Sequence, residues 1–476
     1  SGANQTINQE NIYKNHIRFF YDTGLPILKT KNIKIFKNNV IKTFDIANII
    51  DKGPVHVNLP FEKPLEPDSY TESIEENILS ETLSDKIPQD RGINGKIGNK
   101  KNLNALTSLL KNTTRGLITV GAGNFDQSFF HLLNEVSNKF SLPVFADATS
   151  GLRFNRENIT NLIVNYDSFL RSENFIKAYD PKFIIHFGRP LTSPRIEKFT
   201  QNKSIPVFIV NIFGDFRIKR AVNKIVALEE KDFLKNLLTA DYQIETNKSI
   251  KTLKEIDLFL EQLKSKVLFE TERINEVQIL SEVLNAISPN SNVMIGNSVP
   301  IRDMDFLSSS LKKNLFIHQN RGASGIDGII ATASGIASLS KSPAYLIIGD
   351  LSFYYDLNSL LTLKQLKIPL VIVLINNNGG SIFKFLPIAK HKKVIDKFFL
   401  APTHLDFGKI VQGYGIDFKE IKTRQELINH LKVSGVRKQP VVFEIKTNSD
   451  YSLSLRKKYW KMAELTIDNY LRKYEI

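Results

Sequence analysis

The sequence contains no cysteine, only one tryptophan and only three methionines among its 476 residues. The lack of cysteine excludes disulfide bonds and thiolate zinc sites, and it is typical of a reducing compartment such as the cytoplasm. No apolar run approaches the ~18 residues that a membrane-spanning helix needs. The longest run, residues 370–375, has the length of a strand. We therefore expect no membrane span, and any cofactor must be held by residues other than cysteine.

Acidic residues are scarce relative to basic ones. The chain has 64 Lys and Arg against 49 Asp and Glu, which gives a formal net charge of +15. An excess of this sign suits polyanionic partners such as nucleic acid. The lysines are spread along the whole chain, however, and no basic helix or recognised nucleic-acid-binding module is present. We predict a solvated, lysine-rich surface and no nucleic-acid partner.

Strand-like apolar runs alternate with longer amphipathic stretches, a pattern typical of parallel sheets with helical crossovers. The predicted fold is α/β, with doubly wound parallel sheets. The chain divides into an early piece (1–67), a polar linker (68–100), a second unit (101–245), a third unit (270–450) and a helical tail (451–476). Strands are expected at 53–60, 116–120, 143–145, 183–187 and 206–210, and then at 293–295, 315–318, 344–348, 370–375 and 441–445.

Polar loops follow two neighbouring strands, at the edge where open parallel sheets bind ligands. Gly349 and Asp350 come after one strand, and Asn376-Asn-Asn-Gly-Gly380 comes after the next. Asp350 offers a carboxylate, Asn377 a side-chain amide oxygen and Gly379 a main-chain carbonyl. Three hard oxygens, with positions left for phosphate, suit Mg²⁺ or a similar divalent cation. We expect a metal site that anchors a diphosphate, with Gly349 letting the backbone approach it closely.

Two other sequence features do not indicate a functional site. Gly121-Ala-Gly-Asn124 follows a strand and could be half of a dinucleotide fingerprint, but Asp126 stands where the third glycine belongs. A tight turn is therefore expected there. The eight histidines show no metal-ligand spacing, and we assign none of them a catalytic role.

The two polar loops resemble the diphosphate signature of thiamine-diphosphate enzymes: Gly-Asp, a helix-length insert, then an apolar strand ending in Asn-Asn. Further segments narrow the resemblance to the family of 2-succinyl-5-enolpyruvyl-6-hydroxy-3-cyclohexene-1-carboxylate synthases. These segments are Gly53-Pro-Val-His-Val-Asn58, Gly296-Asn-Ser298 with Arg302, Asn320-Arg-Gly-Ala-Ser-Gly-Ile-Asp-Gly328 and Ile375-Asn-Asn-Asn-Gly-Gly-Ser-Ile-Phe383. The match runs from the first residues to near the end, and segment 320–328 distinguishes this synthase from other thiamine enzymes.

The resemblance implies a transferase that joins 2-oxoglutarate to isochorismate by conjugate addition, releasing CO₂, in menaquinone or phylloquinone biosynthesis. Thiamine diphosphate and Mg²⁺ (or Mn²⁺) are the implied cofactors. Because both substrates are dicarboxylates, the site should present arginines that grip carboxylates in bidentate fashion. The matching substrate-binding positions are Arg195, Arg302, Arg321, Asn4, Gln5 and Leu386. The family's basic residue just before Arg195 is here Pro194, a departure that weakens this contact.

The other matched positions surround the cofactor. The resemblance places Ser298, Ile326, Gly349, Asp350, Ser352 and Asn377 against the cofactor, and Asp350, Asn377 and Gly379 on the metal. Ile326 is expected to prop the cofactor in its bent shape. Ile382, Phe383 and Leu386 match an apolar wall over the reacting carbon. The implied catalytic set is Arg302, Arg321, Ile382 and Phe383.

The resemblance makes residues 1–67 the C-terminal remnant of a pyrimidine-binding domain, 101–245 the middle domain and 270–450 the diphosphate-binding domain. Such enzymes need a strand-end glutamate in the pyrimidine-binding domain, which protonates the aminopyrimidine ring. Neither Glu10 nor Glu62 has that context, and the chain begins without an initiator methionine. We expect most of that domain, with its glutamate, to lie outside this sequence.

Three hypotheses remain: a synthase, a cofactor-binding fragment or subunit that is inactive without a separate pyrimidine-binding domain, and another thiamine carboligase such as acetolactate synthase. The last would use pyruvate in place of 2-oxoglutarate. Active sites of the family form between subunits, which predicts a homodimer or homotetramer. The cytoplasm is the expected location, with the plastid stroma as the alternative.

Overall fold

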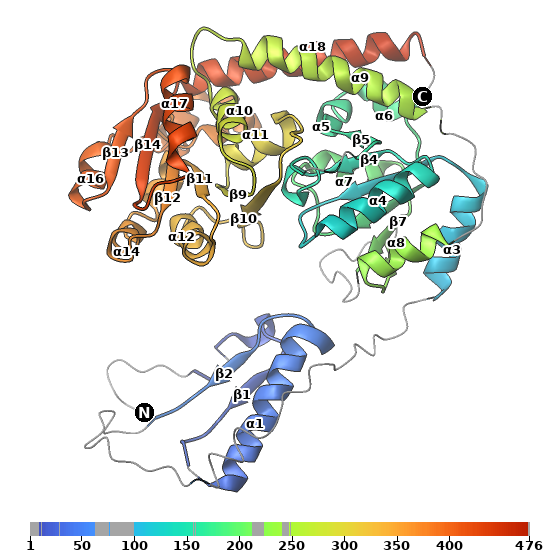
Figure 1. Ribbon diagram of the computed structural model, residues 1–476. Helices are drawn as coiled ribbons and strands as arrows, with labels where there is room; N and C mark the ends of the chain where they lie inside the picture. The colour runs from blue at the N-terminus through green and yellow to red at the C-terminus, as the bar shows by residue number, and fades with distance from the viewer. Residues whose placement is uncertain are drawn as a thin grey trace. The chain divides into compact units, whose positions relative to one another are not determined.

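The computed structural model describes residues 9–10, 12–27, 29–61, 76, 100–155, 157, 159–211, 223–239, 247 and 249–474. The chain forms two compact units, Ser1–Gly98 and Asn99–Ile476, which are coloured blue and cyan to red in Figure 1. Asn4, Gln5 and most of the predicted linker lie outside the described residues.

The first unit contains two parallel strands joined through a helix (Figure 1). Strand β1 (Phe20–Asp22) pairs with β2 (His56–Asn58), and α1 (Thr30–Asp45) lies between them in the chain. The short helices η1 (Lys14–His16) and η2 (Ile46–Ile50) belong to the same unit. A parallel pair needs such a crossover because the chain must return to the same end of the sheet. Strand β2 was predicted within residues 53–60, whereas β1, with three residues, is too short to show a pattern.

Six parallel strands form the first sheet of the second unit. They are β3 (Gly116–Val120), β4 (Val144–Ala146), β5 (Leu162–Ile163), β6 (Phe183–Phe187), β7 (Val207–Val210) and β8 (Asn223–Val226), with helices α3 (Lys100–Asn112), α4 (Gln127–Lys139), η3 (Ala148–Ser150), α5 (Tyr166–Phe169), α6 (Glu173–Ala178), α7 (Pro194–Asn202) and α8 (Glu230–Leu238). The strand order is β5-β4-β3-β6-β7-β8. The four central strands were predicted. The edge strands were missed because β5 has two residues and β8 mixes Asn and Lys with apolar residues.

A second sheet, also of six parallel strands, follows in the chain. Its strands are β9 (Ser291–Ile295), β10 (Leu315–Gln319), β11 (Ala344–Gly349), β12 (Leu370–Asn376), β13 (Asp417–Glu420) and β14 (Val441–Lys446), with helices α10 (Glu276–Ala286), α11 (Val299–Leu307), α12 (Ile329–Leu339), α13 (Asp350–Tyr354), α14 (Ser359–Gln365), η5 (Ser381–Phe385), η6 (Pro387–Lys390), α15 (Lys392–Phe398), α16 (Phe407–Gly413) and α17 (Arg424–Ser434). The order is β10-β9-β11-β12-β14-β13. Only the polar edge strand β13 escaped prediction. The α/β class with doubly wound parallel sheets is confirmed.

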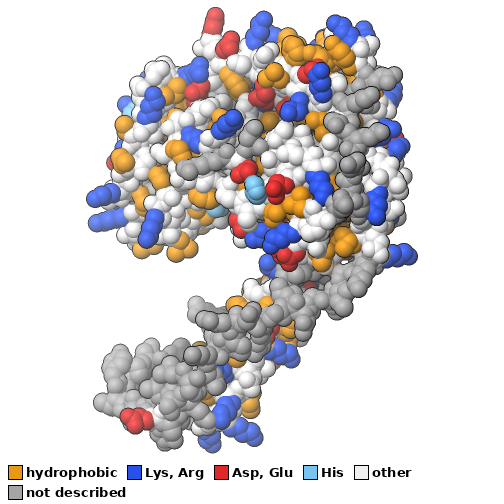
Figure 2. Space-filling model, turned by 45° about the vertical axis from the view of Figure 1, so that its right-hand side comes forward, with side chains coloured by type: hydrophobic (Ala, Val, Ile, Leu, Met, Phe, Trp, Pro, Cys, Tyr) orange, Lys and Arg blue, Asp and Glu red, His pale blue; other side chains and the backbone are white. Residues whose placement is uncertain are grey.

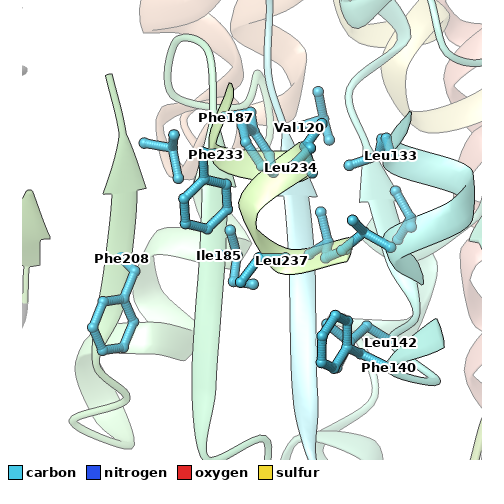
Figure 3. Close-up of a cluster of buried hydrophobic side chains, with 14 of the residues drawn as sticks. Val120, Leu133, Phe140, Leu142, Ile185, Phe187, Phe208, Phe233, Leu234 and Leu237 are labelled. Carbon is cyan, nitrogen blue, oxygen red and sulfur yellow. The ribbon is translucent and has the colours of Figure 1, made fainter. Parts of the chain in front are cut away.

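Burial on both faces explains why the central strands read as unbroken apolar runs. Every residue of β3 and β6 is buried. Figure 3 shows the core on one side of the first sheet, where Phe187 lies beside Phe233 and Leu234 of α8. Leu133 of α4 belongs to the same cluster, so these two helices cover that face of the sheet.

Two long helices, α9 (Ser249–Lys264) and α18 (Ser449–Leu471), lie side by side along one edge of the second unit (Figure 1). Helix η4 (Ser265–Phe269) continues from α9. Leu260 of α9 and Tyr459 of α18 share a buried cluster with Phe169 of the first sheet's layer and Leu307 of the second's. The C-terminal helix thus packs against both sheet layers of this unit.

A buried hydrogen-bonded cluster around Asp305 also joins the two layers. The Arg153 guanidinium donates to the Asp305 carbonyl oxygen at 2.7 Å and lies 3.4 Å from its Oδ1, and both side chains are fully buried. The Tyr166 hydroxyl donates to Asp305 Oδ2 at 2.5 Å. Burial, together with the nearby Asp147 carboxylate, raises the pKa of Asp305 to about 8. These contacts fix α11 relative to the first sheet.

The surface carries charges of both signs. On the face in Figure 2, Lys and Arg side chains are scattered among acidic and apolar ones. None of the helices in the described ranges combines the length and the apolar character needed to cross a membrane.

Candidate active site

The carboxyl edge of the second sheet contains the crevice that parallel topology predicts. The chain leaves β9 for β10 on one side and then forms β11 on the other, and ligands bind where the strand order reverses in this way. Turn 296–298 follows β9, and Asp350 begins α13 directly after β11. Two segments that were singled out from the sequence therefore flank one crevice.

Asp350 ties the loops after β11 and β12 together. Its side chain is 5% exposed, Oδ2 accepts a hydrogen bond from the Gly379 N–H at 2.8 Å, and Oδ1 accepts one from its neighbour Leu351 at 2.7 Å. Burial raises the pKa of the Asp350 carboxyl, and the backbone donors oppose that rise. The donors that oppose it are the backbone N–H groups of Gly379, Leu351, Asn377 and Asn378, so the carboxylate is held by the loops after both strands.

Asn377 is held in one orientation by its neighbours. Its Nδ2 donates to Glu276 Oε1 and to Ser381 Oγ, each at 2.8 Å. Because only the NH₂ group can donate to a carboxylate, these bonds fix which way the amide faces, and Oδ1 lies on the opposite side. No sequence pattern indicates that Glu276, 101 residues away, contacts this amide.

Gly379 occupies a position that only glycine fills without strain. Its φ is +107°, and a Cβ there would lie 2.7 Å from the carbonyl carbon of Ala401. At Gly349, by contrast, a Cβ would meet no described atom within 4 Å. The space next to the Gly379 backbone is therefore filled by Ala401. The space next to the Gly349 backbone is open, and a diphosphate could approach there.

The donors at this edge fit a hard divalent cation. Asp350, Asn377 and Gly379 together offer a carboxylate, an amide oxygen and a main-chain carbonyl, and the structure brings their loops together. Magnesium uses one or two carboxylates and completes its octahedron with phosphate oxygens and water. Ser352, also predicted to face the cofactor, lies on α13 and is 3% exposed.

Ser298 and Arg302 form the other side of the crevice. Ser298 has φ 73° and ψ −125°, a conformation that costs a non-glycine residue about 1 to 3 kcal/mol. Its carbonyl accepts a hydrogen bond from Arg302 Nη1 at 2.6 Å. Burial lowers the pKa of the Arg302 guanidinium, and the positive charge of Arg321 lowers it further. Arg321 therefore lies near enough to Arg302 to act on the charge of its guanidinium.

The loop that carries Arg321 is anchored to the turn after β9. Asn297 Nδ2 donates to the carbonyl oxygens of Asn320 and Gly325, at 2.9 and 2.6 Å. Ile326, predicted to support the cofactor, is half-buried in the same loop. The segment most specific to the resemblance is thus bonded to the crevice it was expected to line.

A pocket of about 360 Å³ adjoins the crevice. It contains five of the predicted residues, which come from three distant segments: Arg195, Arg302, Ile382, Phe383 and Leu386. Val299 and Asp303 line both this pocket and a small cavity beside Gly349 and Asn377. The expected apolar wall and two of the three expected arginines therefore face one space next to the metal-type donors.

Sequence reasoning missed part of this pocket. Asp167 accepts hydrogen bonds from Arg171 Nε at 2.7 Å and Ser193 Oγ at 2.6 Å, and it lies 3.6 Å from Arg195 Nε. The Arg171 guanidinium stacks 3.7 Å above the ring of Trp460, the single tryptophan. Asp167 and Arg171 follow the two-residue strand β5, which the sequence pattern did not reveal. Had β5 been recognised as a strand, the residues after it would have been candidates for the site.

Comparisons with known proteins identify the family of the chain. Residues 306–445 match the family model described as thiamine pyrophosphate enzyme, C-terminal TPP binding domain. A 2-succinyl-5-enolpyruvyl-6-hydroxy-3-cyclohexene-1-carboxylate synthase of Geobacillus thermodenitrificans is 31% identical over 99% of this chain and 79% of the relative. Synthases of the same name are 32% identical in Bacillus velezensis (87% of this chain, 71% of the relative) and 29% identical in Bacillus cytotoxicus (99% and 80%). The chain therefore belongs to the 2-succinyl-5-enolpyruvyl-6-hydroxy-3-cyclohexene-1-carboxylate synthase family and is a thiamine-diphosphate-dependent transferase.

Proposed function

We propose that the chain joins 2-oxoglutarate to isochorismate by conjugate addition, with release of CO₂, in menaquinone or phylloquinone biosynthesis. One observation carries the proposal: an arginine-lined pocket of about 360 Å³ adjoins the loops tied by Asp350 and Gly379. The name of the relatives gives further support. It describes a succinyl group on a carboxylated ring, which is the product that joining these two acids gives.

The residues at the crevice would hold the cofactors. Asp350, Asn377 and Gly379 would bind Mg²⁺ or Mn²⁺, and the open backbone beside Gly349 would face the diphosphate. Ile326 would support the cofactor from the loop after β10. When bound, thiamine diphosphate supplies the nucleophilic carbon and accepts the electron pair that CO₂ leaves behind.

The arginines would orient the two acids. The positive charge of Arg321 lowers the pKa of Arg302, so a dicarboxylate that binds between the two side chains would stabilise the charged form of Arg302 and form charge-assisted hydrogen bonds. Arg195, whose side chain is 42% exposed, shares the Asp167 carboxylate with Arg171. We place it at the mouth of the pocket, where it meets the second substrate.

The apolar wall would favour loss of CO₂. Ile382, Phe383 and Leu386 surround the pocket beside the arginines, and the Phe383 ring packs edge-on against Phe399 at 5.3 Å. These three side chains offer no polar group to a substrate carboxylate that lies against them, so release of that carboxylate as neutral CO₂ is favoured at the wall.

A second candidate is a chain that binds cofactor but depends on a separate pyrimidine-binding domain for turnover. Among the described residues of the first unit the glutamates are Glu10, which lies in a turn, and Glu76, and neither ends a strand. This candidate predicts that the chain binds thiamine diphosphate with Mg²⁺ yet releases no CO₂ until that domain is supplied.

The test is CO₂ release by the purified protein with thiamine diphosphate and Mg²⁺. We expect release from 2-oxoglutarate, with isochorismate consumed in equal amount. Release from pyruvate in preference to 2-oxoglutarate would contradict the proposal and support another carboligase. Cofactor binding without any release, restored by adding a pyrimidine-binding domain, would support the second candidate.

A further inference from the structure

Three charged side chains are buried together behind the crevice. Glu276, at the start of α10, is 3% exposed, Asp303 of α11 is 5% exposed, and Arg456 of α18 is 1% exposed. Arg456 Nε donates to Asp303 Oδ1 at 2.8 Å, and its Nη2 donates to Glu276 Oε2 at 2.7 Å and to Asp303 Oδ2. Burying charged groups away from water costs free energy, and apolar side chains could fill the same space. The presence of three charged side chains here therefore indicates a role other than packing.

Glu276 divides its carboxylate between this cluster and the crevice. Oε2 faces Arg456, whereas Oε1 accepts the hydrogen bond from Asn377 Nδ2 at 2.8 Å and a longer one from Thr447 at 3.4 Å. The bond to Asn377 has an ionised acceptor, so it is stronger than a bond between neutral groups. It is also directional, because an amide turned by 180° would present its oxygen to the carboxylate and repel it.

We infer that Glu276 is a positioning residue that directs the Asn377 amide oxygen toward a bound divalent cation. Arg456 of the C-terminal helix holds Glu276 in place. The inference rests on the metal role proposed for Asn377. Supporting groups of this kind fix the orientation of a metal ligand, and losing one typically costs about 10- to 100-fold in metal affinity. The C-terminal helix, whose Arg456 lies 180 residues from Glu276 in the sequence, thereby contributes to the metal affinity of the site.

Arg456 also explains why the cluster needs two carboxylates. With Glu276 alone, the guanidinium could follow either carboxylate oxygen, but the two-point contact with Asp303 fixes its plane. The Phe385 ring lies 5.7 Å below the same guanidinium. Glu276 is therefore held by a cation whose own position is determined by two other elements.

The decisive experiment titrates Mg²⁺ against the purified protein in the presence of thiamine diphosphate, with cofactor binding followed by calorimetry. In Glu276→Gln, the neutral side chain can present its own NH₂ to Asn377 and lets the amide turn. We expect this variant to need about 10- to 100-fold more Mg²⁺ for half-maximal binding than the wild type.

The matched control is Glu282→Gln, on the same helix α10, which also removes one buried negative charge paired with an arginine, Arg424, but touches neither Asn377 nor Arg456. We expect both variants to lower the melting temperature of the cofactor-free protein, and only Glu276→Gln to change the Mg²⁺ requirement. Equal Mg²⁺ requirements in the two variants would overturn the inference, because a purely structural cluster predicts that result.

A third variant, Asn377→Ala, separates this inference from the proposed function. If Asn377→Ala raises the Mg²⁺ requirement and Glu276→Gln does not, the metal site stands and the role of Glu276 is wrong. If neither variant changes the requirement, the metal role of Asn377 fails and the role of Glu276 fails with it.

Discussion

The two sheets of the second unit are both six-stranded and parallel, and in both the strand order reverses once near the middle, but they differ at the place where this reversal creates a crevice. In the first sheet the strand order reverses between β3 and β6, and in the second between β9 and β11. In the first, the turns after these strands bond to each other: Gly121 N–H donates to the Phe187 carbonyl and Arg189 N–H to that of Ala122. A Cβ on Gly121 would lie 1.7 Å from the Arg189 oxygen. The two turns are therefore in direct contact at Gly121, and a cavity of about 790 Å³ begins beyond that contact, at Ala122 and Arg189.

The helix that follows β3 is also closed to an anion. Asp126 caps α4 by accepting a hydrogen bond from the Phe129 N–H, and Lys231 lies 3.1 Å from the same carboxylate. In the second sheet the corresponding edge is open beside Gly349 and presents Asp350. Where the strand order reverses, the first sheet thus has two turns in direct backbone contact, whereas the second presents ligand-type donors, so function depends on the residues at the strand ends.

Removing the ligand-type carboxylate of the open crevice should have the largest effect. We expect Asp350→Ala to weaken Mg²⁺-dependent binding of thiamine diphosphate by more than the about 10- to 100-fold that follows loss of a supporting group. Calorimetric titration measures it. Asp356→Ala is the control, because Asp356 is equally buried but bonds to Ala331 and Ser359 instead. Normal affinity in Asp350→Ala would remove the metal assignment.

The closed crevice should respond in stability and not in binding. Gly121→Ala forces a methyl group against the Arg189 carbonyl, and we expect the free energy of unfolding to fall by about 3 kcal/mol. Urea unfolding of the cofactor-free protein measures the change. Gly335→Ala, in the middle of α12 with no described atom near its Cβ, should instead gain about 0.5 to 1 kcal/mol. A Gly121→Ala protein of unchanged stability would show that the two turns of the first sheet are not in close contact at Gly121.

The arginines of the open crevice should matter for substrate. Each charge-assisted hydrogen bond contributes about 1.5 to 3 kcal/mol, so Arg302→Ala should raise the KM for 2-oxoglutarate or isochorismate by about 10- to 100-fold. Arg321→Ala is expected to act in the same direction. Arg424→Ala, which loses only an ion pair with Glu282, should leave both KM values unchanged. Unaltered kinetics in both crevice variants would rule out the arginine grip.

The smallest expected effect concerns strain in the open crevice. Ser298 holds a backbone conformation that glycine adopts readily, so Ser298→Gly should raise the free energy of unfolding by about 1 kcal/mol. A thermal or urea melt detects a change of this size. A loss of stability instead would mean that the Ser298 side chain contributes more than its conformation costs.

The sequence predicted the parts of the site that are local. Asp350, Asn377 and Gly379 each follow a strong apolar strand, so their place at one sheet edge follows from parallel topology alone. Strands β5, β8 and β13 could not be predicted from the sequence, because they are polar or only two residues long and lack a periodic pattern. Asp167 and Arg171 follow β5 and line the pocket, and they were not predicted because that strand was not predicted.

By itself, then, the sequence determined the α/β class, the central strands and the donor residues at their ends, because each depends on short stretches whose chemistry is visible in the residues. Only the tertiary structure decided how those donors are oriented. Glu276 reaches Asn377 across 101 residues and Arg456 reaches Glu276 across 180. Contacts of that span leave no periodic trace in a single sequence, since packing of the C-terminal helix, and not local propensity, brings the partners together.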